Sequence, residues 1–232
     1  MKKIFIFLFS LLIIGSFSLS AVTKLSFKDY CNDEEKQEKA VLSGISQAIP
    51  GKEESAGNEN EDEIIIFSSS IKSLLKAELI AEVEPVGKTK WEYQAALCTL
   101  KVKKVFKGDV KPDELIDFYE TSFFNIVNKD ELRFFNASLF TPMREGNSYI
   151  IFGNRKDFHP LYEKKLERKV FVQKGLDISW FQTEMTEPAV LSEDKEYTYG
   201  EIKDLEFLCS TKEQRSRIID FKKEMLSVLS EM

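Results

Sequence analysis

Residues 91–110, WEYQAALCTLKVKKVFKGDV, constrain the possible fold more than any other stretch of the sequence. Every second position at the centre of this stretch is small or apolar, so that one side of an extended chain carries Ala96, Cys98, Leu100 and Val102. The opposite side becomes polar and basic toward its end. This alternation predicts a long strand with one face in a core.

The alternation slips where that strand approaches its end. Val105 and Phe106 are two apolar residues in succession, and Lys107 and Gly108 follow directly. One extra residue in the pattern is typical of a β-bulge or a sharp bend. We therefore expect the chain to turn a corner here.

Shorter strand patterns lie on both sides of this stretch. Residues 148–152 are apolar on both faces and are therefore expected to form a central strand. Residues 121–141 contain several aromatic side chains without a clear pattern, and no element is assigned to them. The remaining predictions are strands over 77–86 and 115–120 and a last hairpin over 170–181 that pivots on Gly175.

Helices are predicted near both ends of the chain. Residues 29–49 begin with acidic residues and carry apolar ones at near-helical spacing, and residues 70–76 suit a turn or two of helix. Residues 211–232 begin with a capping-box pattern, Thr211 with Gln214. An apolar stripe predicts that this last helix docks on the protein's own sheet: Ile218, Phe221, Met225, Val228 and Met232.

Residues 1–20 have the pattern of a secretory signal peptide. Lys2 and Lys3 precede an apolar run, and Ser18 and Ser20 stand where a signal peptidase would inspect the chain before Ala21. A retained membrane anchor is the alternative, but the apolar run is shorter than the roughly 20 residues of a bilayer span. We expect a cleaved leader, a periplasmic or extracellular product, and no membrane span after cleavage.

The mature chain is divided by composition. Residues 21–49 form the N-terminal helical segment, and residues 50–63 are rich in Gly, Ser, Asn and acids, which predicts a flexible acidic loop. Residues 64–210 are predicted to form the β domain, and residues 211–232 form the C-terminal helix.

The overall charge argues against nucleic acid as a partner. The chain has 33 Lys and Arg against 39 Asp and Glu, a formal net charge of -6. Such a chain has no general attraction for phosphate backbones. The dense basic run of Lys101, Lys103, Lys104 and Lys107 is expected to be the solvated side of a strand.

Three short motifs resemble a known family. Val102, Val105, Lys107 and Gly108 match a V-x-x-V-x-K-G strand ending. A second motif has a glycine followed by an aromatic strand, and it is matched by Gly146, Tyr149, Ile150, Ile151 and Phe152. The third is a late C-S-x-T, matched by Cys209, Ser210 and, one place early, Thr211. Together these positions resemble the bacterial relatives of the netrin-type module and of the tissue inhibitors of metalloproteinases.

The resemblance implies a five-stranded Greek-key barrel of the oligonucleotide/oligosaccharide-binding (OB) type with helices against its side. This agrees with the predicted fold class, which is mainly β with flanking helices. The family's Cys-Gly pair is replaced here by Asn136-Ala137-Ser138. The segment from Asn154 to Leu208 is also longer than in the family pattern, so an inserted hairpin is predicted over about 155–208.

Inhibition of metalloproteases is not carried over from the resemblance. The family's inhibitors begin with a Cys whose free amine and carbonyl bind the protease zinc. Here the predicted mature N-terminus is Ala21, and the first cysteine, Cys31, comes well after it.

The three cysteines leave an odd thiol. Cys98 falls on the predicted core face, where a free thiol behaves as a small apolar side chain. Cys31 and Cys209 both flank helices that need tethering, so we predict a disulfide between them, worth roughly 4 kcal/mol on the chain-entropy model. The other pairings stay open.

Candidate catalytic groups are few. The single histidine, His159, lies beside Pro160 and is expected to be a loop residue. One His and three scattered Cys do not make a zinc site, and no phosphate-binding loop appears. Five carboxylates could form an acid/base pair, although solvated charge is the expected role: Glu114, Asp117, Glu120, Asp130 and Glu131. We predict no catalytic residue, no metal site and no cofactor.

The sequence leaves three functional hypotheses. The first is a non-enzymatic exported module that binds another exported or envelope protein, and an exposed apolar patch rimmed by charge would favour it. The second is a glycan or small-ligand binder that uses exposed aromatic residues of the barrel, with Trp91, Tyr93, Tyr119 and Trp180 as candidates. The third is an enzyme, which two acids buried in one cleft would favour.

Overall fold

The structure of the protein is a computed structural model that describes residues 30–43, 70–92, 95–127, 131–136, 139–156, 167–174, 178–186, 189–192 and 194–232. The predicted leader (1–20) and acidic loop (50–63) lie outside these residues. So do Tyr93, Asp130, His159 and Gly175.

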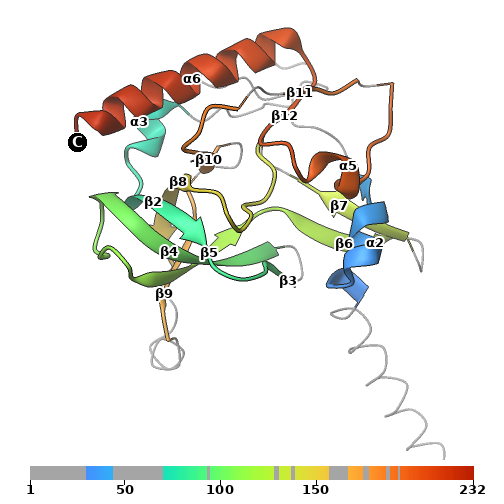
Figure 1. Cartoon of the computed structure of the whole chain (residues 1–232), viewed down its shortest axis with the longest axis horizontal. Coiled ribbons are helices and arrows are strands. Elements are labelled where there is room, and N and C mark those ends of the chain that lie inside the picture. Colours follow the sequence, from blue (N-terminus) through green and yellow to red (C-terminus); the bar gives the residue numbers. More distant parts are fainter. Residues whose placement is uncertain are drawn as a thin grey trace, which may run out of the picture.

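Five strands close into a barrel (Figure 1). They are β2 (Leu79–Pro85), β4 (Ala95–Lys107), β5 (Leu115–Glu120), β8 (Tyr149–Arg155) and β9 (Lys169–Gln173). The order around the barrel is β8-β2-β4-β5-β9, and β9 pairs again with β8. Only β5 and β9 are parallel within this ring. This arrangement confirms the predicted fold class, an OB-like barrel with flanking helices.

The alternation of the long strand is confirmed in β4. The side chains of Ala96, Cys98, Leu100 and Val102 are all buried. The register between β4 and β2 shifts twice, and one shift leaves Phe106 unopposed between the pairs Ala81–Val105 and Ile80–Lys107. The predicted bulge therefore occurs where the sequence pattern slips.

A corner fixes the end of β4 against the start of β2. Gly108 has φ +116°, and a Cβ atom at this position would lie 2.8 Å from the carbonyl oxygen of Glu78. Lys107 Nζ donates to the carbonyl oxygen of Leu75 at 3.0 Å. The corner therefore needs glycine for both its backbone conformation and its space.

The second motif starts β8. Gly146 has φ +84° in the turn before the strand, and the hydroxyl of Tyr149 accepts a hydrogen bond from Arg144 N at 3.0 Å. Phe152 is fully buried, as is Val102 of the first motif, whereas Val105 is half-buried beside the bulge. The motif residues thus shape the barrel rather than a solvent-facing site.

The segment predicted as an inserted hairpin differs from that expectation. Its first strand, β9, is the strand that closes the barrel. Its second strand, β10 (Trp180–Gln182), pairs with the first half of β8, while β9 pairs with the second half. The two strands therefore share β8 as a partner and do not pair with each other.

A smaller unit packs beside the barrel. Its sheet has the order β1-β7-β6, formed by β1 (Val41–Leu42), β6 (Phe123–Val127) and β7 (Glu131–Phe135). Three further elements surround this sheet: α2 (Glu34–Lys39), β3 (Lys90–Glu92) and α5 (Tyr199–Ile202). β6 and β7 occupy the stretch to which the sequence assigned no element.

The N-terminal helix is shorter than predicted. Asp33 caps α2 by accepting from the backbone N–H groups of Glu35 and Lys36, but the helix ends at Lys39. Val41 and Leu42 then pair in parallel with β7. Pairing with a distant strand overrides the helical spacing of the apolar residues.

Two hydrophobic cores result. We call the larger the barrel core; it includes Cys98, Phe118, Met143, Trp180 and Cys209. We call the smaller the second core; it consists of Cys31, Ala40, Trp91, Ala96, Phe124, Leu132, Phe134, Leu191, Ile202 and Leu208.

The C-terminal part of the chain covers the barrel. α6 (Lys212–Ser230) runs across the top of Figure 1 near α3 (Ile71–Leu74), with the short strands β11 (Ala189–Val190) and β12 (Leu208–Cys209) beneath it. Thr211 caps α6 as predicted, since its Oγ1 accepts from Gln214 N at 3.0 Å. No helix in the described part of the chain is long and apolar enough to cross a membrane.

The buried face of α6 agrees only in part with the predicted stripe. Ile218, Phe221 and Met225 are buried in the barrel core, as expected. Leu229 takes the next position, whereas Val228 is half-buried and Met232 is exposed. The helix docks on the protein's own barrel, as predicted.

Candidate functional site

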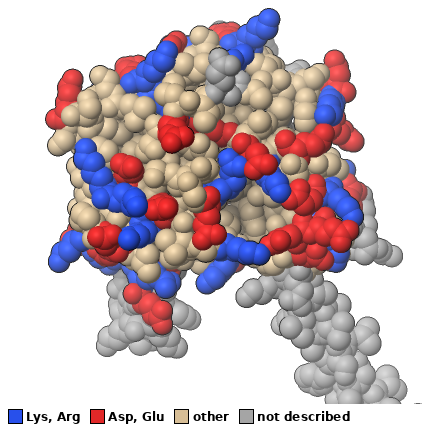
Figure 2. Space-filling view, in the orientation of Figure 1, with Lys and Arg blue, Asp and Glu red and all other residues tan. Residues whose placement is uncertain are grey.

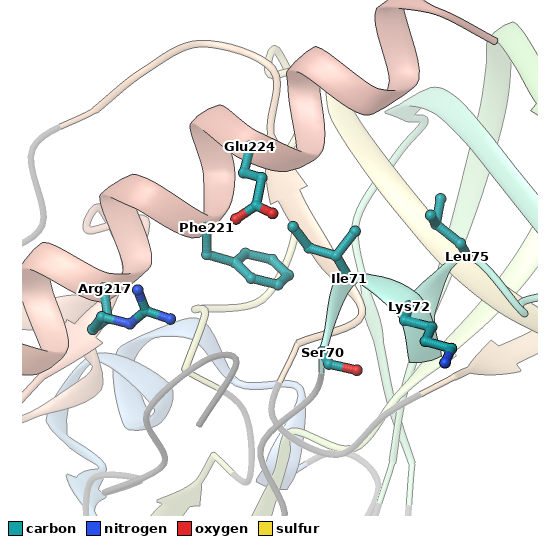
Figure 3. A pocket seen from close by; sticks show the side chains of 7 residues that line it. All are labelled: Ser70, Ile71, Lys72, Leu75, Arg217, Phe221 and Glu224. Atoms are coloured by element: carbon teal, nitrogen blue, oxygen red, sulfur yellow. The ribbon is translucent and has the colours of Figure 1, made fainter. Parts of the chain in front are cut away.

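An open groove lies between α3 and α6 (Figure 3). Its volume is about 550 Å³. The floor is apolar, and three charged side chains stand around it. The lining residues are Ser70, Ile71, Lys72, Leu75, Arg217, Phe221 and Glu224.

Two helices position these side chains. On α6, Arg217, Phe221 and Glu224 stand four and three residues apart, which places them on one face. Figure 3 shows Phe221 and Ile71 at the centre of the groove, with Glu224 above them and Arg217 and Lys72 on opposite sides. The groove thus combines an apolar centre with charge at its edges.

Hydrogen bonds at both ends of the short helix α3 hold it in place as one wall of the groove. Ser70 and Ser73 make a reciprocal capping box, with backbone-to-hydroxyl distances of 3.2 and 3.1 Å. Lys107 of the β4 corner binds the carbonyl oxygen of Leu75 just beyond the helix. The hydroxyls of Ser70 and Ser73 are thus engaged in capping, and the other groove residues offer apolar contact and charge.

The candidate carboxylates in the described part of the chain have separate partners, and Asp130 lies outside that part. Asp117 accepts from Thr99 Oγ1 at 2.9 Å, Glu114 lies 3.4 Å from Lys169 Nζ, and Glu131 pairs with a neighbouring arginine on β7. Within the described residues, no group of three or more Cys, His, Asp or Glu side chains could hold a metal ion.

Glu120 is the exception to the expectation of solvated acids. Its side chain is only 1% exposed because it follows Ile116 and Phe118 on the inward face of β5. Its Oε1 accepts from Cys98 Sγ and from Met143 N, both at 3.2 Å. Burial raises the pKa of Glu120 to about 8, and burial also raises the pKa of the Cys98 thiol well above its usual value.

A buried ion pair, which was not predicted from the sequence, joins α6 to the segment before it. Lys222 Nζ lies 2.8 and 3.1 Å from the two carboxylate oxygens of Glu206, and Gln182 N donates to the same carboxylate at 2.8 Å. Burial raises the pKa of Glu206 and lowers that of Lys222, while their mutual hydrogen bonds oppose both shifts. The available signal was the position of Lys222 one turn from Ile218 and Met225, on the apolar face.

The three aromatic candidates in the described part of the chain, Trp91, Tyr119 and Trp180, are not assembled on a surface. Trp91 and Trp180 are both buried, and Trp180 Nε1 donates to the carbonyl oxygen of Thr141 at 3.2 Å. Tyr119 is half-buried, with its hydroxyl 3.4 Å from Glu92 Oε2. Neither tryptophan can stack on a sugar ring from solvent.

In the structure the three cysteines are free thiols, and the Cys31–Cys209 disulfide stays a prediction. Cys31 packs in the second core and Cys209 in the barrel core. Each thiol is buried among its own apolar neighbours. Cys98 is buried and free in the structure.

Two of the four lysines in the basic run on β4 form ion pairs with acidic side chains. Lys101 pairs with Asp113 at 2.8 Å and Lys103 with Glu84 at 2.9 Å, while Lys104 Nζ lies 4.4 Å from the centroid of the Phe106 ring. Figure 2 shows basic and acidic side chains interspersed over most of the visible face. These lysines therefore do not form a field of one sign.

No protein-family model matches the chain, and no curated protein matches it. A functional assignment therefore depends on the groove and the buried groups.

Proposed function

We propose that the protein is an exported, non-enzymatic binding module that contacts another exported or envelope protein through the groove between α3 and α6. The observation that carries this proposal is the apolar floor of Ile71, Leu75 and Phe221 with charged side chains at its edges. A concave apolar surface rimmed by charge is typical of a protein-interaction site.

Other features support parts of the proposal. The charge and apolar pattern of residues 1–20 supports export. Glu114, Asp117 and Glu131 each have a separate partner, which supports a role without catalysis. We also propose that the chain is a distant relative of netrin-type modules, because its motif residues lie at the β4 corner and the start of β8 of an OB-like barrel.

The groove suits a partner that inserts a few apolar side chains. Fully burying one leucine or phenylalanine side chain contributes about 1.5–3 kcal/mol. Two such side chains on the floor would offset part of the cost of association, and ion pairs at the rim would fix the orientation more than the affinity. The interaction is therefore expected to weaken strongly when a charge is placed on the floor.

Site-specific photo-crosslinking tests the proposal. A photoreactive amino acid replaces the exposed Lys72 at the groove, and a matched control replaces the exposed Lys223 on the solvent side of α6. Incubation with an envelope and medium extract of the host should yield one dominant adduct from position 72 and not from position 223. Ile71→Asp should abolish that adduct. Equal labelling from both positions, or an adduct unaffected by Ile71→Asp, would refute the groove as the binding site.

A further inference from the structure

Glu120 lies where the two cores meet. It is the last residue of β5, and its partner in the ladder with β4 is Ala96, a member of the second core. Its side chain contacts Cys98 and Met143, which belong to the barrel core. The chain continues from Glu120 almost directly into β6. A change at this carboxyl group therefore acts on the connection between the barrel and the smaller unit.

The carboxyl group has few partners for its charged form. Oε1 has the two donors already described, neither of which carries a charge, and Oε2 has no hydrogen-bond partner within the described part of the chain. A buried carboxylate is stable only when it is well paired. Burial therefore favours the neutral acid over the anion, although the hydrogen bonds from Cys98 and Met143 oppose it in part.

Charged and titratable groups from the neighbouring elements do not compensate. Burial raises the pKa of the Tyr199 hydroxyl at the start of α5. The charges of Glu120 and Cys98 raise this pKa further. Arg144, which also faces Tyr199, directs its guanidinium group to Asp204, with Nη2 3.2 Å from the Asp204 carbonyl oxygen. Both terminal guanidinium nitrogens of Arg144 are thus bonded to Asp204.

We propose that Glu120 is a protonation-linked latch: as a neutral acid it holds the smaller unit of β6, β7 and Trp91 against the barrel, and loss of its proton favours separation of that unit.

The direction of the pH effect follows from the pKa of Glu120 in the closed state and in the open state. In the closed state the carboxyl group is buried, with a pKa of about 8, and in the open state it is hydrated, with an ordinary pKa of 4.5. Between these two values the open state has lost the proton and the closed state keeps it. The opening equilibrium should therefore rise about tenfold per pH unit between about pH 5 and pH 8 and level off above about pH 8.

Hydrogen exchange of the mature chain, corrected for the intrinsic pH dependence of amide exchange, tests the latch. Amides of β6 and β7 should show this rise, whereas amides of β2 and β4 in the barrel should not. In Glu120→Gln the rise should disappear. A parallel rise in all strands would mean global unfolding and would overturn the proposal, as would the same rise in Glu120→Gln.

A measurement on the wild-type protein tests the latch even if Glu120→Gln does not fold. Infrared spectroscopy of the wild-type protein at pH 7 should show the carbonyl band of a neutral buried carboxylic acid, and this band should vanish as pH rises through about 8. Absence of the band at pH 7 would overturn the latch without any substitution.

Discussion

The barrel core and the second core are held together in different ways. The barrel is a closed ring of hydrogen-bonded strands, so each of its strands has a neighbour on both sides. The second core joins short segments from distant parts of the sequence through aromatic rings. Trp91 lies 4.6 Å from Phe124 and 6.2 Å from both Phe134 and Tyr199 by ring centroids. A closed ladder distributes its stability over many contacts, whereas an aromatic cluster concentrates it in a few side chains.

The largest expected effect follows from removing the central ring of the second core. Trp91→Ala should lower the free energy of unfolding by about 3–5 kcal/mol, because it removes a large buried side chain that the short strands cannot replace. Chemical denaturation measures the loss. Emission from Trp180 in the barrel core should still report a folded barrel, and its loss at the same denaturant concentration would show that the two cores unfold as one.

Part of the stability of the barrel region is also concentrated in one contact, the buried ion pair of Glu206 and Lys222. Lys222→Met should cost about 3–5 kcal/mol, since it leaves Glu206 buried without its cation. Adding Glu206→Leu should recover most of this loss, as measured by denaturation of both variants. If the double variant were as unstable as the single one, packing rather than charge would explain the effect.

A smaller effect is expected at the β4 corner. Gly108→Ala should cost roughly 1–3 kcal/mol, because the new methyl group meets the Glu78 carbonyl oxygen in a backbone conformation that disfavours it. Gly87→Ala is the matched control: φ there is also positive, at +78°, but a Cβ atom would have nothing within 4 Å. Denaturation midpoints of the two variants separate the clash from the backbone strain, and equal losses would argue against the clash.

The smallest effect, none at all, is expected from reducing agent. Because Cys31 and Cys209 are free in the structure and lie in different cores, no disulfide ties the two regions together there. Thiol titration of the denatured, unreduced protein should find three reactive thiols, and the unfolding midpoint should be unchanged by dithiothreitol. A count of one thiol would show a disulfide and contradict this expectation, and only a bond that includes Cys31 would link the two cores.

The barrel was predictable from local patterns to a large extent. The alternation from Ala96 to Val102, the slip at Phe106 and the glycine corner each need only neighbouring residues, and all agree with the structure. β6 and β7 escaped prediction because both carry adjacent phenylalanines, such as Phe123 and Phe124, which hide a two-residue period.

The site was much less predictable. The groove depends on where α3 and α6 come to lie together, and that is set by the packing of both on the barrel. The inward position of Glu120 could have been inferred from its spacing after Ile116 and Phe118, and the burial of Lys222 from its place beside the apolar stripe. Whether such a buried charge finds a partner depends on distant segments, which no local pattern contains.

The parallel pairing of β5 with β9 determines when the barrel can close during synthesis of the chain. These two strands are separated by the whole of β6, β7 and β8, so the last seam of the barrel cannot form until synthesis has passed Gln173. Until then β5 is an edge without its second neighbour, and contacts between such distant segments form slowly. A growing chain therefore cannot close the barrel until most of its length has been made.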